Sequence, residues 1–327
     1  MRCIRPDLTR WSRALARPDL ALMLCLALAA PAAGDIAYVT NQNGSTLSLV
    51  DLQTASQVRQ TALPGEPAGI AVVPGAVYTV SAGTKTVRRL DPDTLAVRAE
   101  TVLDGGPIGI AVDAARGRFF VSDWYEARIR VLDAQTLAPV TDLATGAAPA
   151  GLDLSPDGRW LASADRDADA VSVFDAQTLE LRHRAGVGTR PFGLRFAPDG
   201  RLFVGNVGSN DVSVLDADTG DLLATVPVGD RPYGVAFAQG AAFVSNQYAG
   251  TVSVLDLATL EQRAVLTVGD YPEGIDTSAD GSLVIVANWF DNTLSVIDAT
   301  TLDVVHEIEV GDGPRAFGRF ILSGGSP

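Results

Sequence analysis

The sequence has very few of the residues that most often build metal sites or catalytic sites. Its 327 residues include 2 Cys and 2 His, only 6% are aromatic, and Lys85 is the single lysine. Both cysteines, Cys3 and Cys25, precede residue 34, so the chain beyond that point cannot form a disulfide bond. The sequence therefore has few residues that could form a Cys/His zinc site or a histidine-based catalytic site, and we expect neither a metal nor a cofactor.

Basic residues are also scarce. Asp and Glu number 39 against 25 Lys and Arg, which gives a net charge of -14. This charge would repel phosphates, so we expect no nucleic-acid partner unless Arg190, Arg231 and Arg315 form a local basic patch. A hydrophobic content of 47% excludes a disordered chain and is ample for a packed core.

The apolar stretch at residues 20–33 is short for a membrane span. It has 14 residues, where a spanning helix needs roughly 20. It follows five arginines and ends in Ala30-Pro31-Ala32, the small-residue pattern that a signal peptidase accepts. Residues 1–33 are therefore predicted to be a cleaved signal peptide, with an uncleaved membrane anchor as the alternative.

Cleavage would leave 20 basic and 37 acidic residues, a net charge of -17. We expect this mature chain to be monomeric, to lack a membrane span, and to reside in the periplasm or the medium of a Gram-negative-like bacterium.

One motif is repeated seven times after the leader. An Asp ends each "SVLD"-like run, a Thr follows three residues later, and a Pro opens a "P-x-G" element, in which Ala316 replaces the glycine of the last unit. The Asp positions are 51, 91, 133, 175, 216, 256 and 298, and the Pro positions are 67, 107, 149, 191, 232, 272 and 314. Both series have spacings of 40, 42, 42, 41, 40 and 42 residues. A repeat of this length is typical of propeller blades or solenoids.

The pattern inside a repeat favours a propeller. Residues 193–228 hold four short Val- and Leu-rich runs separated by Gly, Pro and Asp turns, which predicts four strands and hence one blade. The fold is therefore predicted to be all-β, a seven-bladed β-propeller of four-stranded antiparallel blades over residues 34–322. The first repeat lacks an inner strand, whereas the last unit at 314–322 consists of an inner strand alone. The C-terminal strand should therefore complete blade 1 and close the ring. Residues 323–327 are predicted to be a flexible tail.

These repeats resemble the YVTN family of β-propeller repeat proteins. The match includes Tyr38-Val39-Thr40-Asn41 and the segments at 251–256, 268–274 and 286–288, and it extends over residues 36–322. The chain is similar to the propeller modules of quinoprotein amine dehydrogenases and to secreted proteins encoded beside quinone-dependent alcohol-oxidation systems. The resemblance implies an extracytoplasmic binding or accessory role. It does not select a function, because blades of this kind serve many roles.

The residue that follows each of these prolines should rim the central channel. In blades 5, 6, 7 and 1 it is Phe192, Tyr233, Glu273 and Arg315, with Arg190 and Arg231 just before two of the prolines. One interpretation is a half-ring ligand site with aromatic walls and a charged pair. The other is a salt bridge between neighbouring blades beside two packed aromatic side chains.

The loops between the second and third strands carry a second group of candidates. A polar residue recurs ten positions before each anchoring Asp, in most repeats an Asn or Asp, and its regularity indicates turn capping. The aromatic residues that follow are irregular and are expected on one face, where they mark a binding surface or wedge between blades: Trp124, Tyr125, Tyr248, Trp289 and Phe290.

Charged residues also occur within the inner strands. Asp153 and Asp276 occupy equivalent positions in blades 4 and 7, and Arg195 holds that position in blade 5. An ion pair between Asp153 and Arg195 is expected, and a channel cation such as Ca²⁺ is the less favoured alternative.

Enzymatic motifs are absent from the sequence. His183 and His306 fall in outer strands, and no nucleophile elbow, phosphate-binding loop or Cys/His metal spacing occurs. The predicted function is therefore a non-enzymatic module that binds a periplasmic protein or a small ligand. The alternative is a lactonase-like hydrolase or lyase that uses Glu273 and Arg315 at the channel mouth.

Overall fold

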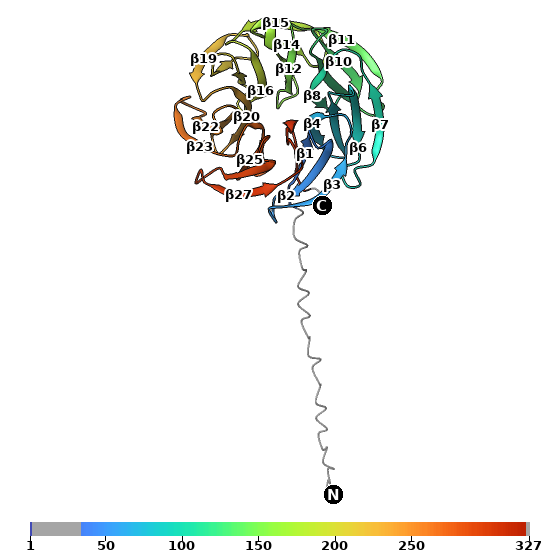
Figure 1. The fold of residues 1–327 in the computed structure, drawn as a ribbon, viewed down its shortest axis with the longest axis vertical. Helices are drawn as coiled ribbons and strands as arrows, with labels where there is room; N and C mark the ends of the chain where they lie inside the picture. The colour runs from blue at the N-terminus through green and yellow to red at the C-terminus, as the bar shows by residue number, and fades with distance from the viewer. Residues whose placement is uncertain (2–33, 325–327) are drawn as a thin grey trace. The chain divides into compact units, whose positions relative to one another are not determined.

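Seven β-sheets follow one another around a ring (Figure 1). The computed structural model describes Met1 and residues 34–324, so residues 2–33 of the predicted signal peptide and the last three residues of the predicted tail lie outside the described residues. Among the described residues, no helix has both the length and the hydrophobicity to cross a membrane. The predicted all-β propeller with seven blades is confirmed.

The inner strands of blades 2 to 7 each begin at the repeat's proline, which is tolerated there because the first residue of a strand need not donate to the ladder. They are β4 (Pro67–Val73), β8 (Pro107–Asp113), β12 (Pro149–Leu154), β16 (Pro191–Phe196), β20 (Pro232–Ala238) and β24 (Pro272–Thr277). The second strands are β1 (Ile36–Asn41), β5 (Ala76–Ser81), β9 (Arg118–Asp123), β13 (Trp160–Asp165), β17 (Leu202–Asn206), β21 (Ala241–Asn246) and β25 (Leu283–Asn288).

The third and fourth strands complete each blade. The third strands are β2 (Thr46–Asp51), β6 (Thr86–Leu90), β10 (Arg128–Asp133), β14 (Ala170–Asp175), β18 (Asp211–Leu215), β22 (Thr251–Asp256) and β26 (Thr293–Asp298). The outer strands are β3 (Ser56–Ala62), β7 (Val97–Val102), β11 (Pro139–Ala144), β15 (Leu181–Gly186), β19 (Leu222–Pro227), β23 (Gln262–Thr267) and β27 (Val304–Glu309). A short 3-10 turn, η1 (Arg166–Ala168), follows β13.

Burial decreases from the middle of a blade to its rim. All six residues of β21 are buried, because neighbouring blades cover both faces of the strand, whereas β23 alternates exposed and half-buried residues at the ring's edge. The hydrophobic core accordingly lies between blades: Phe203 and Val212 of blade 5 pack with Val235 and Val244 of blade 6. Both histidines lie in outer strands, as expected.

The recurrent Asp and Thr of each repeat hold the turn between the third and fourth strands. The Asp175 carboxylate accepts hydrogen bonds from the backbone N–H groups of Gln177 and Thr178, both at 2.9 Å, and the Thr178 hydroxyl accepts one from Glu180. The Thr178 N–H, followed by the neighbouring Arg182 and then by the Gln177 N–H, lowers the pKa of Asp175 to about 2. The structural role that the repeat pattern indicated is confirmed.

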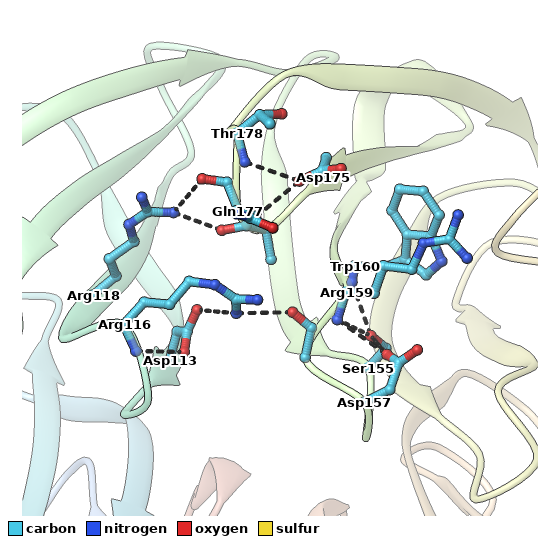
Figure 2. A network of polar contacts seen from close by, with 12 residues as sticks. Asp113, Arg116, Arg118, Ser155, Asp157, Arg159, Trp160, Asp175, Gln177 and Thr178 are labelled. Carbon is cyan, nitrogen blue, oxygen red and sulfur yellow. Dashed lines mark hydrogen bonds and ion pairs between the residues drawn. The ribbon is translucent and has the colours of Figure 1, made fainter.

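Side chains at the start of the second strands reach across to the next blade's turn. Arg118 of blade 3 donates to the carbonyls of Ala176 and Gln177 in blade 4, at 2.6 and 3.0 Å, and Figure 2 shows Arg118 facing Gln177. Tyr38 and Tyr78 donate in the same way to Pro92 and Ala134. Blades 1, 2 and 3 therefore each anchor the turn of the next blade as well as packing against it.

The ring is closed by the C-terminal segment. As predicted, β29 (Ile321–Leu322) completes blade 1 by pairing with β1, and the Tyr38 N–H donates to the Phe320 carbonyl at 2.8 Å. The preceding β28 (Phe317–Arg319) instead pairs in parallel with β4 of blade 2, which makes that sheet five-stranded. The expected single inner strand at 314–322 is thus split between two blades.

The glycine of each "P-x-G" element lies against the backbone of the next blade. A Cβ added at Gly151 would come 2.7 Å from the Phe192 carbonyl oxygen, and one at Gly193 would overlap the Tyr233 carbonyl oxygen. Real Cβ atoms do not approach so closely, so the motif requires glycine for steric reasons at the ring's centre.

We predict that Gly193→Ala lowers the free energy of unfolding by about 1–3 kcal/mol, because the added methyl group must displace a neighbouring strand. Gly186→Ala is the matched control, since a Cβ there meets nothing within 4 Å. Urea unfolding measures both variants. A Gly193→Ala protein as stable as the control would contradict the close approach of the inner strands.

Candidate functional site

Two sets of loops meet on one face of the ring, which we call the loop face. It consists of the loops between the second and third strands and the loops that lead into the inner strands. Backbone hydrogen bonds join the two loops within a blade. The backbone N–H of Trp124 donates to the Gly106 carbonyl at 2.8 Å, and the backbone N–H of Trp289 donates to the Tyr271 carbonyl at 3.0 Å. The variable residues of the sequence are therefore held on a rigid frame.

An aromatic cluster fills the channel mouth at the centre of this face. The Phe192 ring lies 4.6 Å from the Tyr233 ring and 5.2 Å from the Phe317 ring, measured between centroids, and Trp124 lies 6.1 Å from Phe192. Phe192 is 7% exposed and Tyr233 is 2% exposed. Both side chains pack into the mouth, so the second interpretation, packed aromatic residues, holds for them.

The predicted charged pair lies beside this cluster. The Arg315 Nε lies 3.2 Å from a Glu273 carboxylate oxygen, and the Arg315 guanidinium also donates to the Tyr233 hydroxyl at 2.7 Å and to Gln42 Oε1 at 2.9 Å. Gln247 donates to the other Glu273 oxygen at 2.5 Å. The expected ion pair between blades is present, and two glutamines complete it.

Burial sets the electrostatics of this group. Glu273 is only 3% exposed, and loss of solvation raises the pKa of its carboxyl group, although the positive charge of Arg315 opposes the rise. Burial likewise raises the pKa of the Tyr233 hydroxyl. Burial works against the charge on Arg315, but Glu273 and Tyr233 outweigh it and raise the pKa of the guanidinium. The group is a closed network in which each charge has a partner.

The recurrent polar residues before these loops are fully buried and structural. Asn246 donates to the hydroxyls of Thr251 and Ser253 at 3.1 and 3.0 Å, and the Asp165 carboxylate accepts from the Ser163 hydroxyl and from Gly146 N–H. Their partners are mainly side chains of the third strand. Their regularity thus reflects the bridging of two strands more than the capping of a turn.

A second aromatic group lies further out, over blades 6 and 7. We call Tyr248, Tyr271, Trp289 and Phe290 the aromatic patch. Their rings form a connected set with centroid separations from 4.7 to 5.8 Å. Tyr248 is 60% exposed and Phe290 is 57% exposed, and Arg231 lies over the Tyr248 ring at 4.6 Å. Here the prediction of exposed aromatic residues on one face agrees with the geometry.

The remaining candidates lie on the other side of the mouth. Trp124 and Tyr125 line a groove of about 360 Å³ together with Phe192 and Arg315. Tyr125 is 76% exposed, whereas Trp124 is half-buried. Arg190 is exposed on the loop that leads into β16, and it does not line this groove. The candidate residues thus form a central packed network and two separate flanking surfaces.

The charges within the channel pair differently from the expectation. Asp153 does not pair with Arg195. Arg195 instead pairs with Asp276 at 3.0 Å, and Asp153 pairs with Arg319 of the C-terminal segment at 3.1 Å. The split of the last strand causes this change, because it brings Arg319 into the ring while the Gly318 carbonyl accepts from Arg195 at 3.0 Å.

A channel cation is not favoured by this arrangement. Each of the two aspartates has an arginine partner, and Asp276 also accepts from the Phe320 and Ile321 N–H groups, at 2.8 and 3.2 Å. Within residues 34–324, no group of three or more His, Cys, Asp or Glu side chains could hold a metal ion. The charged residues that line the channel are therefore paired with one another, which does not favour an ion site.

Sequence reasoning missed several residues of the site. Gln42 and Gln247 each follow the recurrent Asn directly, so their place in the repeat was the available signal. Tyr271 precedes its proline just as Arg190 and Arg231 do. Phe317 had no such signal, because it enters the mouth only through the split of the last strand.

Comparisons with known proteins agree with this architecture. A YNCE-like beta-propeller family model matches residues 235–322, and a model of the 7-bladed beta-propeller lactonases matches residues 116–237. Neither covers half of the chain, and the lactonase match includes neither Glu273 nor Arg315. No curated protein matches the chain. The chain is a seven-bladed β-propeller built from repeats, as the sequence resemblance implied.

Solved structures show the same fold in proteins of diverse description. Hydrazine synthase from Kuenenia stuttgartiensis is 20% identical, with a TM-score of 0.72, over 81% of this chain and 92% of that chain. A functionally unknown protein from Desulfotomaculum acetoxidans DSM 771 is 16% identical, with a TM-score of 0.74, over 85% and 98%. A streptogramin B lyase is 18% identical, with a TM-score of 0.67, over 80% and 92%. At these identities the likeness defines the fold alone.

We predict that Arg195→Met lowers the free energy of unfolding by about 3–5 kcal/mol, because it leaves the buried Asp276 carboxylate without its counter-ion. Arg182→Met is the matched control: it removes the ion pair with Asp175 on an outer strand, where Arg182 is 46% exposed. Its expected cost is below about 1 kcal/mol. Equal urea midpoints for the two variants would contradict a structural role for the channel pair.

Proposed function

We propose that this protein is a non-catalytic binding module whose loop face captures a partner protein. One observation carries the proposal, the aromatic patch on blades 6 and 7. Exposed aromatic clusters of this kind mark binding surfaces, because large rings add contact area at low cost in conformational entropy. The frame behind the patch is rigid, so the surface is already arranged before a partner arrives.

The sequence context directs the choice of partner. The resemblance implies partners among extracytoplasmic, quinone-dependent oxidation systems, such as a quinoprotein dehydrogenase or a cytochrome c. A net charge of -17 after loss of the leader would favour a partner with a basic docking surface.

The lactonase-like or lyase alternative has less support. Glu273 is 3% exposed, and its carboxylate is already engaged by Arg315 and Gln247 beneath the packed aromatic cluster. A general acid or base must reach the reacting group, and this carboxylate is not positioned at an open surface. Turnover of a lactone or ester that is lost in Glu273→Gln would contradict the non-catalytic proposal.

The leader supports a location outside the cytoplasm, and this leads to a prediction. Expressed in a Gram-negative host, the full chain should appear in the periplasmic fraction with its N-terminus near residue 33, as intact mass measures. A chain that begins at residue 34 should stay in the cytoplasm. Recovery of the full-length mass in the membrane fraction would support the anchor alternative instead.

A second prediction tests the aromatic patch. The double variant Tyr248→Ser/Phe290→Ser should reduce partner capture about tenfold or more, because exposed aromatic residues supply most of the binding energy in such surfaces. Stability should change by less than about 1 kcal/mol, since both side chains are mostly exposed. The measurement is quantitative mass spectrometry of proteins retained from a periplasmic extract by the immobilised propeller.

Val265→Ser is the matched control for this experiment. Val265 lies on β23 of blade 6 and is 52% exposed, but it lies on the outer strand away from the loop face. The control should retain the same proteins as the unmodified chain. A double variant that captures the same proteins at the same level would overturn the assignment of the patch.

A further inference from the structure

The groove beside Trp124 differs from the aromatic patch and has the features of a small-molecule site. Its volume is about 360 Å³, at the lower end of the range for ligand pockets. Its walls come from blades 2, 3 and 5 and from the C-terminal segment. They comprise Ala82, Lys85, Gly105, Gly106, Pro107, Ile108, Trp124, Tyr125, Phe192 and Arg315.

The charge of this groove is opposite to that of the chain. None of the residues that line the groove is acidic, although the sequence holds 39 Asp and Glu. Two of the lining residues, Lys85 and Arg315, are cationic. A groove of similar size, about 380 Å³ between blades 4 and 5, is lined by two arginines and by four aspartates, at positions 157, 199, 216 and 218. The lining of the groove beside Trp124 therefore differs from it in carrying cationic and no acidic side chains, which suits an anionic ligand.

Lys85 supplies the available charge. It is exposed and forms no ion pair among the described residues, whereas Arg315 is already held by Glu273. Lys85 occupies the left-handed backbone position just before a third strand, with φ of 56°. The equivalent positions in the other six blades are filled by Ser, Ala, Asp, Asn and Gly. Asn, Asp and Gly adopt this conformation more readily than Lys does, so the only lysine stands at a position that its backbone does not favour.

The aromatic side chains form a wall for a flat ring. The half-buried Trp124 is fixed between Phe192, at 6.1 Å, and the Arg166 guanidinium, at 5.4 Å from its ring. Tyr125 stands at the rim, where a Cβ added at Gly106 would come 2.7 Å from its ring. Both rings line the groove, so a planar ligand would find aromatic surface to stack against there.

We propose that this groove binds a small planar aromatic carboxylate, with its ring against Trp124 and Tyr125 and its carboxylate toward Lys85. The inference rests on the proposed binding role of the loop face, but it concerns different residues from the aromatic patch. Aromatic ring surface and a lysine without an acidic partner are the chemistry that these walls offer together.

Isothermal titration with matched probes tests the proposal. 2-Naphthoate, neutral 2-naphthamide and cationic 2-naphthylmethylammonium share a ring system and differ in charge. The unmodified chain should bind the acid about tenfold more tightly than the amide, and it should bind the cation least, because hydrogen bonds to charged groups are the stronger ones. Equal affinities for acid and amide, preference for the cation, or no saturable binding of the acid would each overturn it.

Charge reversal locates the site. Lys85→Glu should weaken binding of the acid about tenfold and remove the preference for acid over amide, because it replaces attraction by repulsion at the groove's edge. Arg190→Glu is the control, since it makes the same change in net charge on the same face but outside the groove. It should change affinity less than about twofold. Identical effects of the two variants would show that only the overall charge matters and would overturn the site.

The stacking wall and the aromatic patch are tested apart. Tyr125→Ser should weaken acid and amide alike, by about fivefold, because it removes ring contact and no charge. An unchanged affinity for both probes would overturn the stacked pose. Tyr248→Ser/Phe290→Ser should leave naphthoate binding intact, and Lys85→Glu should leave partner capture intact, so failure of this proposal and failure of the proposed function give different results.

Discussion

The contact between neighbouring inner strands at the centre of the ring is the constraint on which the rest depends. The glycine of each "P-x-G" element brings one strand against the backbone of the next, as Gly193 does with the Tyr233 carbonyl. This spacing sets how closely seven blades can converge. It also places the residue that follows each repeat's proline at the channel mouth, which is why Phe192, Tyr233, Glu273 and Arg315 meet there.

Closure of the ring follows from the same geometry, but the C-terminal segment performs it in two parts. β29 completes blade 1, while β28 crosses into the channel and pairs with blade 2. Asp276 accepts the N–H groups of Phe320 and Ile321, and Asp153 holds Arg319. Both carboxylates are buried, and backbone N–H donors compensate only part of their lost solvation, so each also needs its arginine. Together these contacts fix the path of the C-terminal segment.

A symmetric frame with an asymmetric face explains how one repeat can carry a specific function. The Asp and Thr turns are nearly the same in every blade and take part in packing between blades. The loop face carries the differences: an exposed aromatic patch on one side of the sealed mouth and a cationic groove on the other. Because the mouth between them is closed by Phe192, Tyr233 and Phe317, the two surfaces can act independently.

The number of blades, the four strands of each blade and the role of the Asp turns can be read from the repeats, because each is a local pattern that recurs seven times. The outer location of the histidines follows from the same strand pattern. The pairing of Glu273 with Arg315 could be predicted as well, since they lie in adjacent blades. The structure was needed to show that Arg195 pairs with Asp276, that Phe317 enters the mouth, and that Tyr233 is buried while Tyr248 is exposed. These facts depend on contacts across the ring and on the path of one unrepeated segment, and no periodic pattern encodes either.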